Sequence, residues 1–485
     1  MKRIHRRIVL ISIALISLAM HYKHFSKDLM SIHVWRQTQT QTTIINFYEE
    51  DMNILNPRIN DRGNGDGIFK MEFPLMQWLV ACTYKIFGNH LVLSRIIMFI
   101  IGLFSILGIY SLLSAIFRND TIALIGAWTF NFSPSFYYYT INPLPDNLAL
   151  CCSIWGIALF FKWIRKGKAF LLLCSGLLLS IGALCKLPFI LYFIVPWTYF
   201  GMEFIKNGIS KDLILKTSGV SIFVILPLAW YLSVVPHWHG NGIVKGMLDN
   251  NAPFIVIIDY LQHQLISTLP ELLLNYGSLL FFISGFWFLI KNKSFKNSLF
   301  PIFWVWSIAI LAYFLFEINM IGKIHDYYLF PFYPVLFILV GYGAYHLLSL
   351  EYKWIKYFAL FLLLILPVTT YLRMQSRWNP DSPGFNKDLL TYKEELRNAV
   401  PKDALCIAGN DESHFIFFYY IDKKGWGFDK DNLNAQSLEM MIEKGASYLY
   451  SDSRSIDTNK AIMPALDKLV LEKGSIRVYS LKKNK

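Results

Sequence analysis

Long apolar runs separated by short polar stretches dominate the chain. A helix needs roughly 20 mainly apolar residues to cross a bilayer, and about eleven runs meet this requirement. They begin near Ile8, Val92, Thr121, Asn147, Ala169, Leu187, Leu213, Gly277, Leu299, Tyr327 and Trp354. The pattern predicts an all-α polytopic membrane domain over residues 1–375. No small-x-small cleavage site follows the first run, so we expect a retained anchor.

Basic residues gather in alternate connections between these runs. They are Arg118, Lys162, Arg165, Lys166, Lys168, Lys206, Lys211, Lys216, Lys291, Lys293, Lys296, Lys353 and Lys356. Because cytoplasmic loops collect Lys and Arg, the alternation predicts a cytoplasmic (inner) membrane protein with its N-terminus in the cytoplasm. The same count places segments 24–89, 139–146, 237–276 and 317–326 outside, together with everything after residue 375.

Two outer regions have patterns of their own. In the large first outer loop, 24–89, residues 42–48 resemble a short amphipathic helix at the interface, and 74–87 is apolar but too short for a full span. Residues 376–485 predict a small extracytoplasmic α/β domain. Its expected helices are 387–400 and 435–444, and its expected strands are 404–408, 446–450 and 476–481.

Composition supports a membrane protein and excludes several other classes. Hydrophobic residues make up 55% and charged residues 16% of the 485, against about 25% charged in soluble domains. Disorder is therefore excluded, and six Cys are too few for a disulfide scaffold. After residue 375 Lys and Arg number 17 against 16 Asp and Glu, and before it 29 against 17. The net charge of +13 therefore belongs to the membrane part, and nucleic acid is not implied.

Ionisable side chains at the outer face are costly in a membrane unless they serve a site or are solvated. Arg36 could clamp a phosphate and Gln37 could bond a sugar hydroxyl, although an interfacial Trp-Arg anchor gives the same pattern. Glu72, just before an apolar helix, suits a general base or a simple dipole-stabilising acid. Asp146 opens a membrane helix and is equally explained as its N-cap.

A fourth polar cluster, at 323–328, contains His325, Asp326 and Tyr328. It could bind phosphate or a divalent cation, and it is also explained as an aromatic belt with a solvated His. The sequence requires no cofactor and leaves the metal open. It contains no phosphate-binding loop, dinucleotide fingerprint, paired CxxC or nucleophile elbow. Because cytosolic nucleotides do not reach an outer site, the pattern favours a lipid-borne donor.

These motifs together resemble the bacterial polytopic glycosyltransferases of the GT-C fold. The resemblance is to the family-39-like branch, related to protein mannosyltransferases and the aminoarabinose transferase of lipid A. It rests in order on His33-x-Trp35-Arg36-Gln37-x-x-Thr40, Asn46-Phe47-Tyr48, Asn53-Ile54-Leu55-x-Pro57, Met71-Glu72-Phe73-Pro74-Leu75, Lys85-Ile86-Phe87-Gly88, Pro145-Asp146, His325-Asp326-Tyr327-Tyr328 and Tyr419-Tyr420-x-Asp422-x-Lys424-Gly425-Trp426.

The resemblance implies inverting transfer of a sugar from a polyprenyl-phosphate carrier to an extracytoplasmic lipid, glycan or protein acceptor. Glu72 matches the acid of the first-loop motif, and Asp146 matches the acid of the second-loop region. With the outer clusters described above, the expected donor-binding residues are Arg36, Gln37, Arg58, Lys70, His325, Asp326 and Tyr328.

Two departures from the family pattern keep alternatives open. Arg36-Gln37 stands where many relatives have an Asp-Glu pair, and Phe73 stands where the lipid A enzymes have a Lys. Asp66 or Glu50 could therefore replace Glu72 as the base, and an inactive GT-C scaffold stays open. A polysaccharide polymerase or ligase should have a large outer loop rich in Arg and His, and a transporter should have ionisable residues within its spans.

Overall fold

The structure is a computed structural model of the 485-residue chain. It describes all residues except 1–2, 239–251, 292–298, 430–432 and 483–485, so Lys293, Lys296 and part of the outer segment 237–276 lie outside the described residues. By their internal contacts the residues form two units. Unit 1 comprises Met1–Phe25, Met71–Phe73 and Arg95–Gln375, and unit 2 comprises Ser26–Lys70, Pro74–Ser94 and Ser376–Lys485.

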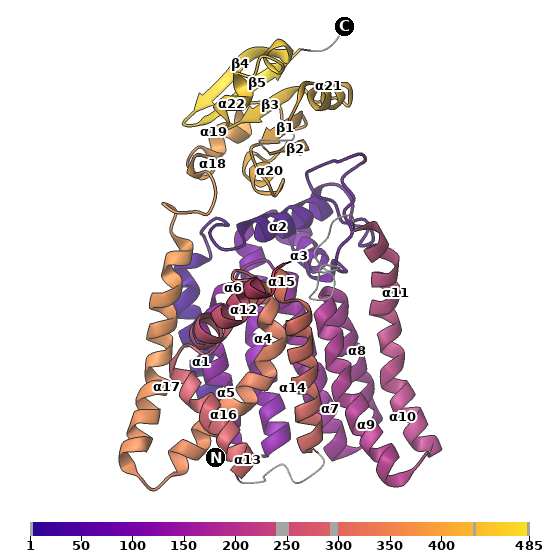
Figure 1. The fold of residues 1–485 in the computed structure, drawn as a ribbon, viewed down its shortest axis with the longest axis vertical. Helices are drawn as coiled ribbons and strands as arrows, with labels where there is room; N and C mark the ends of the chain where they lie inside the picture. Colours follow the sequence, from indigo (N-terminus) through magenta and orange to yellow (C-terminus); the bar gives the residue numbers. More distant parts are fainter. Residues whose placement is uncertain (1–2, 239–251, 292–298, 430–432, 483–485) are drawn as a thin grey trace. The chain divides into compact units, whose positions relative to one another are not determined.

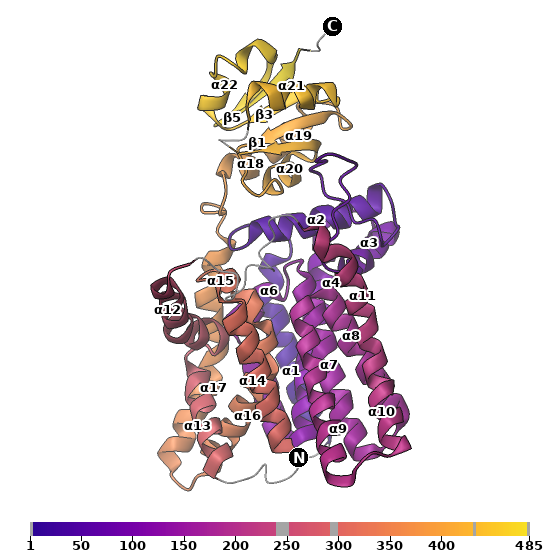
Figure 2. The same ribbon diagram turned by 45° about the vertical axis from the view of Figure 1, so that its right-hand side comes forward.

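The described part of unit 1 is helical (Figure 1). Its helices are α1 (Arg3–His21), α4 (Leu91–Phe117), α5 (Asp120–Asn131), α6 (Pro134–Tyr139), α7 (Pro145–Lys166), α8 (Ala169–Cys185), η2 (Leu187–Phe193), α9 (Ile194–Asn207), α10 (Lys211–Ser221), η3 (Ile222–Val224), α11 (Ile225–Val234), α12 (Phe254–His263), η7 (Gln264–Leu273), α13 (Gly277–Lys291), α14 (Leu299–Phe316), α15 (Ile318–Ile321), η8 (Asp326–Phe332), α16 (Tyr333–Ser349) and α17 (Lys353–Met374). Helices α7, α10 and α11 pack against α8, which Figure 2 shows between them.

Eight helices of the described residues are long and apolar enough to cross a membrane, or nine if the bent pair Phe254–Leu273 and Gly277–Lys291 is one span. A multi-pass membrane protein is therefore confirmed, but the expected count of eleven is not. Two of the expected spans are short: α5 has 12 residues and α8 has 17. The α5 helix ends at Asn131, and α6 starts again at Pro134, because a Pro favours the first turn of a new helix.

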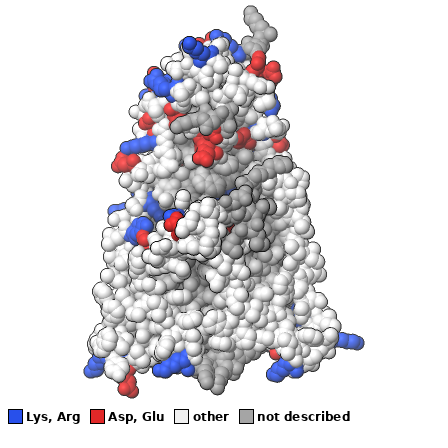
Figure 3. All heavy atoms as spheres, in the orientation of Figure 1, with Lys and Arg blue, Asp and Glu red and all other residues white. Residues whose placement is uncertain are grey.

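Charged side chains are rare along the apolar helices and frequent in the turns between them (Figure 3). Figure 3 shows that the face of the helical unit in view is nearly free of them, and that Lys and Arg gather at the end where the α9–α10 and α16–α17 turns lie. Lys206, Lys211 and Lys353 in these turns are exposed. This is the distribution expected of a bilayer-spanning helical bundle.

Unit 2 contains a five-stranded sheet in the order β2-β1-β3-β5-β4. The strands are β1 (Leu405–Gly409), β2 (Lys424–Phe428), β3 (Tyr448–Ser451), β4 (Leu466–Lys473) and β5 (Ile476–Leu481). Strand β1 is parallel to β2 and β3, whereas β5 is antiparallel to β3 and β4. The helices of this unit are α2 (Val34–Glu49), α3 (Leu75–Phe87), α18 (Lys387–Thr391), α19 (Lys393–Asn398), α20 (Ile416–Ile421), α21 (Ala435–Glu443) and α22 (Arg454–Asp457).

Both faces of the sheet are covered by apolar side chains. One face packs with α20 and includes Leu29 and Val34 of the first outer loop, and the other packs with Leu438 of α21. The Tyr419 hydroxyl donates to Asp28 Oδ1 at 3.0 Å, and Lys393 Nζ lies 2.5 Å from Asp28 Oδ2. The first outer loop therefore completes the core of the C-terminal sheet. Independent folding of 376–485 as a domain stays a prediction.

The expected elements of unit 2 are partly corrected. The helix expected at 42–48 is the longer α2, which is buried on most of its sides rather than amphipathic. The helix expected at 387–400 is divided into α18 and α19 at Tyr392. Strands β2 and β4 and helix α20 were not expected. The small C-terminal α/β architecture itself is confirmed.

Candidate functional site

Helices α7 and α8 bring a carboxylate and a cationic side chain together within unit 1. Pro145 and Asp146 begin α7, because Pro is favoured and acids are stabilising in the first turn of a helix. Lys186 directly follows the last residue of α8. Its Nζ lies 3.4 Å from Asp146 Oδ1, and the two side chains are 13% and 1% exposed. A buried ion pair therefore stands at these two helix ends.

Residues 71–73 hold Glu72 against the same helix end. The Phe73 N–H donates to Leu184 O at 3.0 Å, and Trp230 Nε1 donates to Met71 O at 3.0 Å. Glu72 is 8% exposed, and the hydrogen bond from Phe73 to Leu184 places it near the end of α8, the helix that Lys186 follows. The structure thus brings together the two acids that the sequence predicts as catalytic.

Aromatic side chains of η8 surround the cation. Lys186 Nζ lies 4.5 Å from the ring centre of Tyr328 and 5.3 Å from that of Tyr327, as in cation–π contacts. The His325 ring lies edge-on to both tyrosines, with centroid distances of 5.7 Å and 5.9 Å. The predicted residues His325 and Tyr328 therefore lie at the Asp146–Lys186 pair.

Asp326 faces a different set of partners. The Tyr139 hydroxyl donates to its Oδ1 at 2.5 Å, and the Ser135 hydroxyl donates to its Oδ2 at 3.1 Å. Asp326 is 3% exposed. These contacts fix the start of η8, so they favour a positioning role over the predicted contact with the donor.

Two residues of this cluster, Lys186 and Glu317, are missing from the sequence predictions. Glu317 follows α14, and burial raises its pKa to about 7, with the positive charge of Lys186 acting in the opposite direction. Its Oε2 has no hydrogen-bond partner among the described residues. The signal available in the sequence is a single ionisable residue in an outer connection between two apolar runs.

The remaining predicted donor-binding residues belong to unit 2. Arg36 and Gln37 are buried on α2, where Arg36 donates to the Gln39 side chain and Gln37 Nε2 donates to Ile32 O at 2.9 Å. Lys70 is exposed.

Arg58, the last of the predicted donor-binding residues, lies among carboxylates. It is 3.2 Å from Asp51, 3.2 Å from Asp66 and 3.7 Å from Glu50. These three acids already balance the Arg58 charge, so they disfavour its use for a phosphate.

The alternative bases of unit 2 are poorly suited to accept a proton. Burial would raise the pKa of Glu50, but hydrogen bonds from Arg62 and Lys424 outweigh it and lower the pKa. A hydrogen bond from the Ile68 N–H, together with Arg58, lowers the pKa of Asp66. Both carboxylates are stabilised in the ionised form, so the geometry favours Glu72 over either.

The described residues contain no group of three His, Cys, Asp or Glu side chains that could hold a metal ion. A divalent cation beside His325 would therefore need further ligands from a bound phosphate, because Mg²⁺ is often held by few carboxylates and by substrate phosphates.

An apolar cavity of about 270 Å³ lies within unit 1, between α14, α16, α13 and η7. It is lined by aromatic and aliphatic side chains, including Leu329 and Phe332 of η8 and Phe314 of α14. Helix η8 thus lines the apolar cavity with one part and contacts Lys186 with another. Glu317 follows α14, the other helix shared by cavity and site.

Comparisons with known proteins agree with this fold. Residues 72–233 match the model of the family described as dolichyl-phosphate-mannose-protein mannosyltransferase, a match that includes Glu72, Asp146 and Lys186. A protein of Aquifex aeolicus, described as uncharacterized, is 27% identical over 354 residues, covering 69% of this chain and 75% of its own.

Solved structures of three transferases have similar folds. ArnT from Cupriavidus metallidurans, bound to undecaprenyl phosphate, has a TM-score of 0.68 at 12% identity, over 98% of this chain and 97% of its own. The oligosaccharyltransferase of Archaeoglobus fulgidus has a TM-score of 0.60 at 14% identity, over 92% and 68%. Arabinofuranosyltransferase AftD from Mycobacteria has a TM-score of 0.53 at 10% identity, over 100% and 40%. The expected GT-C fold is confirmed.

Proposed function

We propose that this protein is a glycosyltransferase that moves a sugar from a polyprenyl phosphate to an extracytoplasmic acceptor. The chain is a multi-pass membrane protein with the GT-C fold, and it matches a mannosyltransferase family over residues 72–233. The observation that carries the proposal is the cluster of Glu72, Asp146 and Lys186 in unit 1. It combines two carboxylates with one cation in a buried setting. Such a combination suits proton abstraction from a hydroxyl and stabilisation of a departing phosphate.

The part of the donor's hydrocarbon chain nearest the phosphate lies in the apolar cavity, and the phosphate lies toward Lys186. The cavity lining is almost entirely apolar, and η8 joins it to the tyrosines that contact Lys186. The undecaprenyl phosphate bound to the similar ArnT supports a lipid of this class. His325 and Tyr328 then flank the phosphate or the sugar.

In the proposed reaction the acceptor hydroxyl oxygen attacks the anomeric carbon while the bond from that carbon to the phosphate oxygen breaks. Glu72 accepts the hydroxyl proton, and polyprenyl phosphate leaves with the bonding electron pair. Lys186 offsets the charge that develops on the leaving phosphate, an effect worth about 3 kcal/mol for one such contact. Attack from the face opposite the phosphate inverts the anomeric configuration.

Asp146 holds Lys186 in place and keeps its charge, because a carboxylate at 3.4 Å favours the protonated amine. The base is Glu72, which is 8% exposed, and not Glu50 or Asp66 of unit 2, whose pKa values are lowered. The site faces the extracytoplasmic side of the cytoplasmic membrane, as the basic turns of the opposite side suggest.

The test supplies wild-type protein in nanodiscs with a panel of labelled polyprenyl-phosphate sugars and a membrane extract as the source of acceptor. We expect release of polyprenyl phosphate with at least one donor, and transfer of the label with the opposite anomeric configuration, read from the anomeric proton coupling. Transfer of the sugar with its anomeric configuration retained would overturn the single-displacement mechanism. No release from any donor by folded protein would favour a polymerase, a transporter or an inactive scaffold instead.

A further inference from the structure

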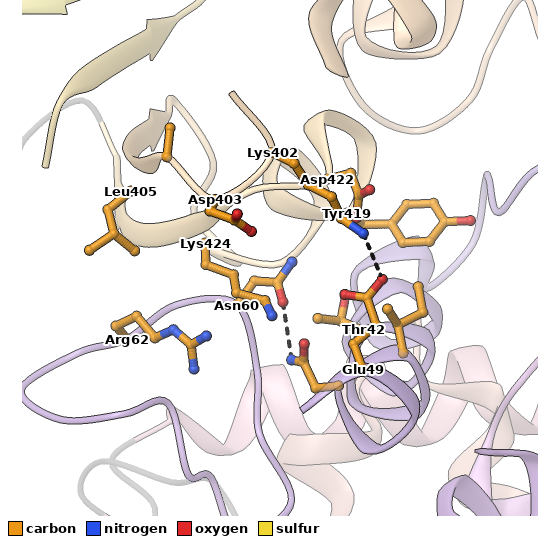
Figure 4. A pocket seen from close by; sticks show the side chains of 13 residues that line it. Thr42, Glu49, Asn60, Arg62, Lys402, Asp403, Leu405, Tyr419, Asp422 and Lys424 are labelled. Atoms are coloured by element: carbon orange, nitrogen blue, oxygen red, sulfur yellow. Dashed lines mark hydrogen bonds and ion pairs between the residues drawn. The ribbon is translucent and has the colours of Figure 1, made fainter. Parts of the chain in front are cut away.

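Unit 2 contains a polar cavity of about 220 Å³ that none of the residues given a role in sugar transfer lines. Figure 4 shows its walls, which come from α2 and the loop after it on one side and from the start of β1, α20 and β2 on the other. The first outer loop and the C-terminal sheet thus form it jointly. It is smaller than the pockets of about 300–1,000 Å³ that hold drug-sized ligands, so it fits one small ring.

Two side chains of α2 that line this cavity each have a buried oxygen atom without a hydrogen-bond partner among the described residues. Thr42 and Asn46 are 3% and 2% exposed, and neither Thr42 Oγ1 nor Asn46 Oδ1 has a hydrogen-bond partner among the described residues. The Asn46 amide nitrogen is satisfied, because it donates to Asn60 Oδ1 and to Arg58 O at 3.1 Å each. A buried unpaired polar atom is costly, so binding would be favoured for a ligand whose hydroxyl reaches these oxygens through a small shift of the two side chains.

The charges around the cavity balance. Its lining contains three carboxylates and three cations, which are Glu49, Asp403, Asp422, Arg62, Lys402 and Lys424. Lys402 Nζ lies 3.3 Å from Glu49, and Arg62 and Lys424 both contact Glu50. The lining thus has no excess of either sign to select a phosphate or an amine. Amides, a hydroxyl and paired charges instead match a ligand that both donates and accepts hydrogen bonds.

From this geometry we infer that the cavity of unit 2 binds one uncharged sugar unit of the acceptor. The inference rests on the proposed function only in identifying this sugar as part of the acceptor, because the cavity selects a neutral saccharide by its own chemistry. The C-terminal sheet and the first outer loop would then together hold one sugar of the acceptor glycan, and a different sugar of that glycan would carry the reacting hydroxyl.

The experiment measures binding by saturation-transfer NMR on full-length protein without donor. The probes are methyl glycosides of glucose, galactose, mannose and N-acetylglucosamine, with glucuronate and glucosamine as charged counterparts. Thr42→Val removes the unpaired hydroxyl, and Thr42→Ser keeps it. Thr43→Val is the matched control, since the Thr43 hydroxyl bonds to Gln39 O at 3.1 Å and does not line the cavity.

We expect a neutral glycoside to bind wild type, Thr42→Ser and Thr43→Val alike, and to bind Thr42→Val about tenfold more weakly, the loss expected for one buried hydrogen bond. Thr42→Val should melt no lower than wild type, because the removed hydroxyl has no partner there. Binding of none of the neutral glycosides, equal binding by Thr42→Val, or tighter binding of the charged probes would overturn the inference.

The same variants separate this inference from the proposed transfer. Thr42-dependent glycoside binding without release of polyprenyl phosphate from any donor would support the cavity and contradict the transferase. Polyprenyl phosphate release with an acceptor KM unchanged in Thr42→Val would support the transferase and contradict the cavity's role.

Discussion

Glu317 is a buried acid of the site whose charge changes near neutral pH. Glu317 is 8% exposed, and burial raises the pKa of its carboxyl to about 7 despite the opposing charge of Lys186. The folded pKa lies above the ordinary value of 4.5, so the folded protein holds this proton more tightly than the unfolded chain. The contribution to stability is therefore present at low pH and is lost as pH rises from about 4.5 to about 7.

The same titration predicts a pH-dependent donor KM. Above pH 7 the ionised Glu317 competes with the donor phosphate for Lys186, so the KM of wild type should rise several-fold between pH 6 and pH 8. Glu317→Gln should keep a flat KM over this range. Glu203→Gln serves as the control, since the partly exposed Glu203 carboxylate accepts a hydrogen bond from the Asn207 side chain at 2.9 Å. An identical rise of KM in Glu317→Gln would contradict the assignment.

The Asp146–Lys186 pair predicts a pattern across single and double variants. Lys186→Met leaves the buried Asp146 carboxylate without its 3.4 Å ion-pair partner, which should destabilise the folded protein by about 3–5 kcal/mol. The double variant Lys186→Met with Asp146→Asn should recover most of that stability but no activity, because the cation for the phosphate is still missing. Thermal unfolding and polyprenyl phosphate release measure the two effects separately. Restored activity in the double variant would remove Lys186 from the mechanism.

At the residue scale, motifs found part of the site. Glu72 and Asp146 stand in recognisable local patterns, and the structure brings them together. Lys186 and Glu317 are single ionisable residues in connections between apolar runs, and a linear sequence does not tell which of these meet. The contacts of Arg58 depend on how the loop at 51–66 turns, so its three carboxylate partners could not be predicted either.

At the scale of helices, glycines permit the close crossing of α13 and α16. A Cβ on Gly343 would lie 2.0 Å from Phe281 O, and one on Gly285 would lie 2.0 Å from Leu339 O. Small residues let helix backbones approach in a membrane, where packing rather than the hydrophobic effect holds helices together. Since α16 lines the apolar cavity together with α13, this crossing also sets the width of the proposed lipid site.

This crossing can be tested with one added methyl group. Gly343→Ala should destabilise the protein by about 1–3 kcal/mol, because the new atom meets backbone that cannot rotate away. Gly201→Ala on α9 is the control, since its Cβ would meet nothing within 4 Å. Thermal unfolding in nanodiscs compares the two. Equal melting temperatures for both variants would show that α13 and α16 are not in close contact.

Helices could be predicted from the long apolar runs of the sequence, whereas short or exposed strands could not be predicted. Every long apolar run became helical, but length alone did not tell spans from the short helices α5 and α8. Strand β2 contains Gly425 and Gly427, which weaken a strand pattern. Gly425 has a φ of +150°, and its Cβ would lie 1.8 Å from Cys406 O, so close pairing with β1 explains a glycine that the sequence alone did not.

At the scale of the whole molecule, the first outer loop and the C-terminal tail are one folded unit. Leu29 and Val34 are part of the sheet core, and His414 Nδ1 lies 2.7 Å from Asp61 Oδ2. The sequence predicted the α/β tail but not its union with the loop, because the residues that meet are more than 300 positions apart. Only the folded chain reveals such a contact.

The Asp61–His414 contact predicts a pH-dependent stability of unit 2. The hydrogen bond to Asp61 raises the pKa of His414, while burial acts against it. The stabilisation is thus complete below the unfolded pKa of about 6.5 and is lost as pH rises through the higher folded value. For a side chain 32% exposed we expect about 0.5 kcal/mol.

Hydrogen exchange of the β2 amides should therefore be slower at pH 6 than at pH 8, after correction for intrinsic rates. His414→Gln should abolish the difference, and His90→Gln, an exposed histidine of the same unit, should retain it. An unchanged difference in His414→Gln would mean that another group causes the pH dependence.

The central claim is that Glu72 removes a proton from the acceptor during transfer from polyprenyl phosphate. The most direct measurement compares polyprenyl phosphate release by wild type, Glu72→Gln and the control Glu203→Gln in nanodiscs, with the active donor. We expect normal folding of all three proteins, wild-type release by Glu203→Gln, and a loss of at least about 100-fold in Glu72→Gln, as for removal of a general base. Wild-type release by Glu72→Gln would contradict the claim.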